Sequence, residues 1–323
     1  RTLRSEQEQG IFPLMENETV RDYLLRWYEN PNLRPKTLHS RKVNIERVSP
    51  YIGGVGIREL KPAQIQGVYD SLEKKLSKSS VLQAHAVLRK ALRDALKEGL
   101  IVSNPMDRVV NTPKTDRKEM SSLNQNEVAI LLNAKDEWSP LWTLLIGTGL
   151  RIGEALGLQW ESIDFDAEIL TIRRTLQRIP GEGLRYQMPK TNKSRRTLYM
   201  PELVSVALRE HRAKQSTHRL MLGPDWKDNG LVFPNEWGGP LEPTRINRAL
   251  KRTLKSVGIN RHIRVHDLRH TAASLALRKG IPGKVVQEML GHATYATTMD
   301  IYSHVDPGMH KEAALEMNKA LGG

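Results

Sequence analysis

The sequence contains no cysteine, few aromatic residues and no long hydrophobic run. Without cysteine there is no disulfide, no thiolate zinc site and no cysteine nucleophile, which suits a reducing cytosol. The longest conspicuously apolar stretch without a formal charge, Trp138 to Leu150, has thirteen residues and two glycines, too short to span a bilayer. No segment near the start has the basic-then-apolar order of a signal peptide. We therefore expect a cytoplasmic protein with no membrane partner, and we interpret residues 1–17 as an N-terminal remnant of a longer chain.

Positive charge is in excess. Fifty Lys and Arg against thirty-six Asp and Glu give a net charge of +14, which favours a polyanionic partner such as nucleic acid. The alternatives are an ordinary basic protein or one that touches acidic membranes. Residues 171–196 hold eight Lys and Arg against the single acid Glu182. Such a concentration suits several closely spaced phosphates better than a solvated face.

The chain is long enough for two domains. Residues 18–110 show apolar residues at helical spacing, and Pro35 and Pro62 stand where a first helical turn tolerates proline. We predict a bundle of four amphipathic helices, the last over residues 79–98. Residues 111–122 are polar and nearly free of large apolar groups, which is typical of an interdomain linker.

A second domain is predicted over residues 123–323. Its expected helices cover residues 126–134, 141–148, 154–158, 201–215, 243–256, 267–279, 284–290 and 297–304. A strand over 163–176, a turn at 181–183 and strands over 184–188 and 196–200 would form one small antiparallel sheet. The predicted fold is therefore mostly α with a small antiparallel β-sheet: a helical domain followed by an α+β domain.

Five separated stretches carry residues suited to phosphate chemistry. They are TGLRIGEALGL from Thr148, PKTNKSRR from Pro189, HDLRH from His266, LGH from Leu290 and TTMDIYSHV from Thr297. Each alone is weak, since a lysine in a turn is usually solvated and a tyrosine near a C-terminus usually packs. Together they supply what cleavage of a phosphodiester without a metal requires: an oxygen nucleophile, several cations and an acid for the leaving oxygen.

In this order the stretches resemble the signature of the tyrosine recombinase family, especially phage and conjugative-transposon integrases, over residues 18–320. The positions that match the family's functional residues are Arg151, Lys190, His266, Arg269, His292 and Tyr302. The resemblance implies a helical core-binding domain, a catalytic domain and a reaction that needs no metal, ATP or other cofactor. It also implies a site-specific recombinase that integrates and excises a mobile element.

The resemblance assigns the roles. Tyr302 would attack the scissile phosphate, leaving a 3′-phosphotyrosine and a free 5′-hydroxyl. Arg151 and Arg269 would hold the nonbridging oxygens, because arginine forks match phosphate geometry. Lys190 would be the general acid that protonates the 5′-oxygen.

The remaining positions would assist this chemistry. His266 and His292 would donate hydrogen bonds or shuttle protons, and Glu154 would orient a neighbouring basic side chain. Two rivals stay open: Lys193 stands three residues from Lys190 on the same predicted turn, and Tyr295 stands near His292 but lacks the DIYSHV context.

The pair His266 and His270 also mimics a zinc motif, with two histidines four residues apart on one helix face. Asp267 and Arg269 fit that motif poorly, because a zinc motif of this type has glutamate after the first histidine and no neighbouring cation. We expect no metal there, and we interpret His270 as a packed or hydrogen-bonded helix residue.

The predicted partner is double-stranded DNA at paired crossover sites. The protein would bind these sites as a tetramer whose subunits dock through a C-terminal tail helix over residues 310–321. Accessory DNA-bending or excision factors would assist.

The interval from Arg151 to Lys190 is longer than in compact family members, so residues 171–196 are predicted to form a β-extension that touches DNA or a neighbouring subunit. The candidate DNA contacts are Lys36, Arg41, Lys42, Lys78, Arg89, Lys90, Arg173, Arg174, Lys193, Arg195 and Arg196. The rival functions are a type IB topoisomerase-like enzyme that relaxes DNA and an inactive DNA-binding protein.

Overall fold

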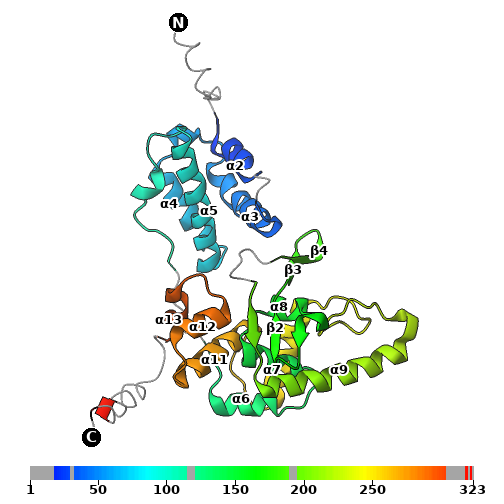
Figure 1. Cartoon of the computed structure of the whole chain (residues 1–323). Coiled ribbons are helices and arrows are strands. Elements are labelled where there is room, and N and C mark those ends of the chain that lie inside the picture. Colours follow the sequence, from blue (N-terminus) through cyan, green and yellow to red (C-terminus); the bar gives the residue numbers. More distant parts are fainter. Residues whose placement is uncertain are drawn as a thin grey trace, which may run out of the picture. The chain divides into compact units, whose positions relative to one another are not determined.

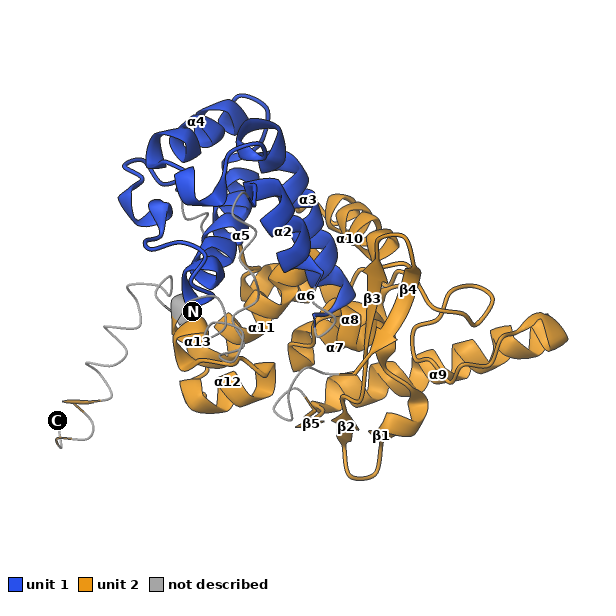
Figure 2. Cartoon of the chain, turned by 90° about the horizontal axis from the view of Figure 1, so that it is seen from above, with its two compact units in different colours: residues 1–117 blue, residues 118–323 orange. Residues whose placement is uncertain are grey.

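The computed structural model describes residues 18–29, 33–114, 121–188, 195–302, 317–318 and 321, with residues 300–302 described by their backbone. The chain divides into two compact units, Arg1–Arg117 and Lys118–Gly323 (Figure 2). Among the described residues, no helix combines the length and apolar character needed to cross a bilayer. Predictions for residues 1–17, for half of the linker 111–122, for Lys190 and Lys193, and for most of the tail helix fall outside the described residues.

The first unit is a helical bundle. Among its described residues the α-helices are α2 (Val20–Tyr28), α3 (Pro35–Ile52), α4 (Pro62–Glu73) and α5 (Lys78–Lys97). Thr19 and Ser77 cap α2 and α5 by accepting hydrogen bonds from backbone N–H groups, and Pro35 and Pro62 begin α3 and α4. The Tyr23 hydroxyl donates to the Ala91 carbonyl at 2.7 Å, which joins α2 to α5 in the core.

The second unit combines helices with two small sheets (Figure 1). Its helices are α6 (Gln125–Leu132), α7 (Ser139–Thr148), α8 (Ile152–Gly157), α9 (Glu202–Leu222), α10 (Pro243–Ser256), α11 (Val265–Arg278), α12 (Gly283–Leu290) and α13 (Tyr295–Tyr302). Its strands are β1 (Ile163–Asp164), β2 (Ile169–Thr171), β3 (Thr175–Ile179), β4 (Gly183–Gln187) and β5 (Thr197–Tyr199). The predicted fold class, mostly α with a small antiparallel β component, is confirmed.

The β region differs from the expected single sheet. The strand predicted over 163–176 is three strands, because Asp164 accepts hydrogen bonds from two backbone N–H groups and turns the chain between β1 and β2. Strands β1, β2 and β5 form one antiparallel sheet, and β3 and β4 form a separate hairpin. That hairpin packs on α8: a Cβ on Gly153 would lie 2.6 Å from the Leu176 carbonyl oxygen.

Helix α9 is longer than predicted. It continues past Gln215 to Leu222 and ends at Gly223, which has φ 54°. Leu220 and Met221 near its end are 81% and 79% exposed, so its last turns have no buried apolar stripe for the sequence pattern to reveal.

Candidate active site

Four predicted site residues lie at element ends or on facing helices of the second unit. Arg151 is the N-cap residue of α8, Arg269 lies within α11, His292 follows α12, and Tyr302 is the last residue of α13. Helices α11, α12 and α13 pack pairwise on one another, as Figure 1 shows. The fold therefore gathers residues from distant parts of the chain into one region.

Arg269 is almost fully buried, with 2% of its surface exposed. One Nη donates to the Gly149 carbonyl at 2.6 Å, and the other donates to the Leu290 carbonyl. Burial, followed by the nearby charge of Arg151, lowers the pKa of Arg269. A guanidinium stays charged even so. The negative charge of a bound phosphate would offset the repulsion between Arg269 and Arg151.

Glu154 is a buried carboxylate that binds two arginines. Its Oε1 accepts from Arg151 at 2.9 Å and from Arg196 at 3.2 Å, and its Oε2 accepts from Arg196 at 3.0 Å and from the Arg151 backbone N–H at 2.9 Å. Burial alone would raise the pKa of Glu154, but the hydrogen bonds from Arg196 and Arg151 outweigh it and the pKa is lowered. The carboxylate is therefore ionised and fixes the side chain of Arg151, which is 40% exposed.

Arg196, predicted as a DNA contact, has an internal position instead. Its side chain is 8% exposed, and its nitrogens donate to Glu154 and to the Met289 carbonyl. We therefore revise its interpretation from a phosphate contact to a structural one. No sequence signal distinguishes Arg196 from Arg195, because the two are neighbours of the same type in a basic stretch.

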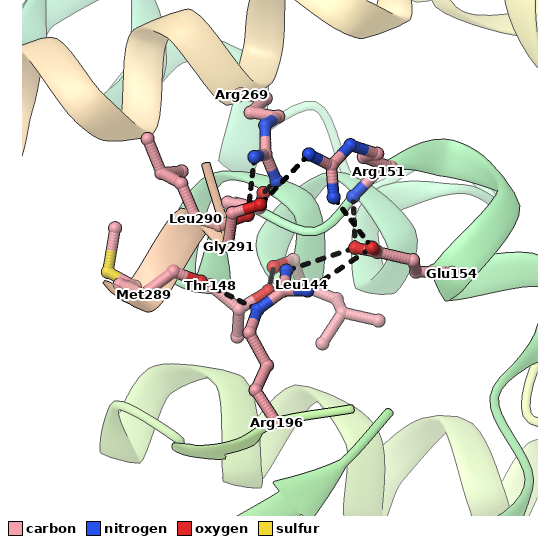
Figure 3. A network of polar contacts seen from close by, with 10 residues as sticks. Leu144, Thr148, Arg151, Glu154, Arg196, Arg269, Met289, Leu290 and Gly291 are labelled. Atoms are coloured by element: carbon pink, nitrogen blue, oxygen red, sulfur yellow. Dashed lines mark hydrogen bonds and ion pairs between the residues drawn. The ribbon is translucent and has the colours of Figure 1, made fainter. Parts of the chain in front are cut away.

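The C-terminal end of α12 is held by three arginines, as Figure 3 shows. The carbonyls of Met289, Leu290 and Gly291 accept hydrogen bonds from Arg196, Arg269 and Arg151 respectively. Carbonyls at a helix end lack partners within the helix and carry partial negative charge. This end of α12 therefore gathers three cationic side chains, of which Arg151 and Arg269 could also contact a phosphate.

The histidines next to these arginines have lowered pKa values. Partial desolvation and, next, the Arg269 charge lower the pKa of His292 to about 4 and also lower that of His266. Desolvation, with His266 next, lowers the pKa of His270 to about 4. These rings are therefore neutral at pH 7. The His292 Nδ1 lies 3.0 Å from the Thr298 hydroxyl, a partner that the sequence analysis missed.

His270 is packed but not fully hydrogen-bonded. Its ring meets that of His266 edge to face at 4.9 Å, and its buried Nδ1 has no hydrogen-bond partner among the residues that the structure describes. Within the described ranges no group of three or more His, Cys, Asp or Glu side chains could hold a metal ion.

The side chains of two predicted catalytic residues, Tyr302 and Lys190, lie outside the described part of the structure. Tyr302 is described by its backbone alone, and Lys190 falls, with its rival Lys193, outside the described residues. Tyr295, the rival nucleophile, is 47% exposed at the start of α13.

The candidate DNA contacts differ in exposure. Exposed members are Lys36, Lys42, Lys78, Arg89, Lys90, Arg173 and Arg195. Two others are partly buried against aromatic rings: Arg41 lies 3.6 Å from the Trp27 ring centroid, and Arg174 lies 4.1 Å from that of Tyr186. Each also donates one hydrogen bond to a backbone carbonyl, Arg41 to Trp27 at 3.4 Å and Arg174 to Gly157 at 3.0 Å, which leaves fewer of their donors for a phosphate.

A basic groove beside the site was not predicted. It lies along α10 and the segment before α11, and it reaches His266. Its basic lining residues are Arg248, Lys251, Lys255, Arg261, His262 and Arg264. In the part of the chain that the structure describes, Arg248, Lys251 and Lys255 have no acidic partner. The sequence predicted helix α10, but the basic residues on its polar face have the spacing of an ordinary solvent-exposed helix face.

Comparison with known proteins identifies the family. A model described as "Phage integrase family" matches residues 115–309, and one described as "Phage integrase, N-terminal SAM-like domain" matches residues 19–72. The chain belongs to the phage integrase family. It is therefore a tyrosine recombinase, an enzyme that cleaves and rejoins DNA strands in site-specific recombination, and DNA is its partner.

Relatives and solved structures agree with this membership. The XerC-like tyrosine recombinase of Caldanaerobacter subterraneus subsp. tengcongensis is 30% identical over 284 residues, which cover 82% of this chain and 72% of that protein. Tyrosine recombinase XerD of Corynebacterium glutamicum is 30% identical over 294 residues, covering 84% and 88%. The Tn1549 transposon integrase, solved in complex with a circular intermediate DNA, shares the fold with a TM-score of 0.78 at 21% identity, covering 94% of this chain and 99% of that one.

Proposed function

We propose that this phage integrase family member cleaves DNA with Tyr302 and that Arg151, Arg269, His266, His292 and Lys190 assist the reaction. The observation that carries the proposal is the convergence of Arg151 and Arg269 on the last carbonyls of α12, beside His292 and the helix that ends at Tyr302. Two guanidinium groups so placed can bind the nonbridging oxygens of one phosphate.

The proposed chemical step is a transesterification. The Tyr302 hydroxyl oxygen attacks phosphorus and gives its proton to a neutral histidine ring, that of His266 or His292. A bond forms between this oxygen and phosphorus, and the bond from phosphorus to the 5′-oxygen breaks. The Lys190 ammonium gives its proton to that oxygen, which leaves as a 5′-hydroxyl. Because the phosphoester energy is kept in the 3′-phosphotyrosine, a 5′-hydroxyl from another strand can reverse the step without ATP.

Neutral histidines fit this scheme as hydrogen-bond donors. His266 and His292 have lowered pKa values, so at pH 7 each ring donates through one N–H without adding a fixed charge. When a phosphate enters, its negative charge offsets the repulsion from the arginines and raises both pKa values.

The wider assignment extends from the relatives. A transposon integrase shares the fold, and we propose that this chain integrates and excises a mobile element in the bacterial cytoplasm. It would act as a tetramer on paired crossover sites, with residues 310–321 docking on a neighbouring subunit and with accessory DNA-bending or excision factors. The basic groove along α10 would contact phosphates next to the scissile one.

The experiment uses nicked duplexes of randomised sequence, incubated without divalent metal. The nick lets the short strand diffuse away after cleavage, so a covalent protein–DNA adduct accumulates. Tyr302→Phe should give no adduct. Tyr295→Phe is the matched control, because Tyr295 begins the same eight-residue helix, and it should give the wild-type amount. Adduct that persists in Tyr302→Phe would overturn the assignment of the nucleophile.

A further inference from the structure

Arg196 joins three parts of the catalytic unit that are distant in sequence. It lies immediately before β5, while its partners Glu154 and Met289 lie in α8 and α12. Its Nε donates to the Met289 carbonyl at 2.9 Å, and its two Nη atoms donate to the two oxygens of Glu154 at 3.2 and 3.0 Å. All three nitrogens thus have protein acceptors, and the side chain is 8% exposed.

Glu154 connects Arg196 to Arg151. Each carboxylate oxygen accepts one hydrogen bond from Arg196 and one from Arg151. A forked guanidinium fixes a carboxylate in its own plane, because two parallel N–H···O bonds leave it little rotation. The orientation of Glu154, and through it the half-exposed guanidinium of Arg151, therefore depends on Arg196.

Close packing at Gly291 supports the same dependence. Gly291 has φ 65°, and a Cβ there would lie 2.9 Å from an Nη of Arg196. The guanidinium therefore occupies the space that any other residue at position 291 would fill. The turn that leads to His292 is thus built against Arg196.

We propose that Arg196 is a positioning residue for strand cleavage, which sets the orientation of Arg151 through Glu154 and fixes the end of α12 that leads to His292. This role rests on the proposed function, in which Arg151 binds the scissile phosphate. Arg196 itself does not touch DNA. The competing role is a direct phosphate contact, and the two predict different outcomes.

The test is a double-mutant cycle on single-turnover adduct formation from a nicked duplex. Arg196→Met should slow the reaction about 100-fold, the effect of a misplacement of about 1 Å in a reacting group. In the Arg151→Ala background the same change should slow it less than about tenfold, because the orientation of Arg151 no longer matters and only the support of the end of α12 is lost. Affinity for intact duplex and its dependence on salt should stay as in the wild type.

Two further variants guard the interpretation. Arg196→Lys keeps the charge beside Glu154, but its single nitrogen cannot reach both carboxylate oxygens and the Met289 carbonyl. This variant should therefore react about tenfold more slowly than the wild type, or slower still. It replaces Arg196→Met in the test if Arg196→Met does not fold. Arg219→Met removes an arginine paired with Asp228 at 2.9 Å near the end of α9, and it should react at the wild-type rate.

Three outcomes would overturn the proposal: a wild-type rate in both Arg196 variants, an equal loss with and without Arg151, or weakened DNA affinity with a shallower salt dependence. The last would support a direct phosphate contact. If the wild-type protein formed no adduct on any duplex, the proposed function would fail instead, so the two failures are distinguishable.

Discussion

The buried carboxylate of Glu154 gives the sharpest stability prediction. Glu154→Gln keeps the shape of the side chain but removes its charge and turns one acceptor into a donor. Arg196, 8% exposed, would then keep a buried charge without its counter-charge. Removing one partner of a buried ion pair costs about 3–5 kcal/mol, whereas the more exposed Arg151 pair adds little. For a unit of this size each kcal/mol lowers Tm by about 2–4 °C, so we expect a decrease of about 6–20 °C at pH 7.

Tryptophan fluorescence during heating would measure this decrease, because five of the six tryptophans lie in the second unit. The matched control is Glu182→Gln. Glu182 pairs with Arg185 at 3.7 Å, with exposures of 48% and 62%, and its loss should cost less than about 1 kcal/mol.

The difference between wild type and Glu154→Gln should also depend on pH. The folded pKa of Glu154 lies below its ordinary value of 4.5, so its stabilising contribution is complete above pH 4.5 and is lost as pH falls through the folded pKa. The gap in Tm should therefore be constant near neutrality and narrow below pH 4.5. A gap of less than about 2 °C at pH 7, equivalent to no more than about 1 kcal/mol, would refute the reasoning.

Other predictions concern nearby residues. Gly291→Ala should cost about 1–2 kcal/mol in unfolding free energy, because a left-handed backbone disfavours a Cβ, and should slow adduct formation; wild-type values of both would contradict the close packing. The folded pKa values of His270 and His292 lie at about 4 against 6.5, so the unfolded chain binds more protons between these values and stability should fall as pH drops from 6.5 to 4. His270→Asn should flatten that slope in pH-dependent melts, and an unchanged slope would contradict the assignment. Lys251→Gln and Lys255→Gln should each weaken DNA binding and reduce the salt slope by about 0.9 if each contacts one phosphate; titrations at several salt concentrations would show this, and unchanged slopes would exclude such contacts.

Much of the helical architecture followed from local chemistry. Pro35 and Pro62 begin helices where the missing N–H has no intrahelical partner to lose, and α10 has its predicted bounds, Pro243–Ser256. The strand pattern was harder, because strands as short as β1, β2 and β5 show too few alternating residues to fix their ends. Predicting one strand over 163–176 therefore missed two breaks, one of which is the turn that Asp164 makes.

The candidate active site was likewise only partly predictable from the sequence. The sequence alone determined which residue types are available and in what order, from Arg151 to Tyr302, because that order is written in the chain and matches a family pattern. The resemblance to that family also implied that Glu154 would orient a basic neighbour.

Only the tertiary structure decided which arginines face inward. Arg195 and Arg196 are neighbours of the same type, yet one is exposed and the other is buried against Glu154 and Met289. Their difference depends on a carboxylate from α8 and a carbonyl from the end of α12, which meet Arg196 only after folding. Burial and hydrogen bonding are properties of what surrounds a side chain in space, and local sequence patterns report only neighbours a few residues away.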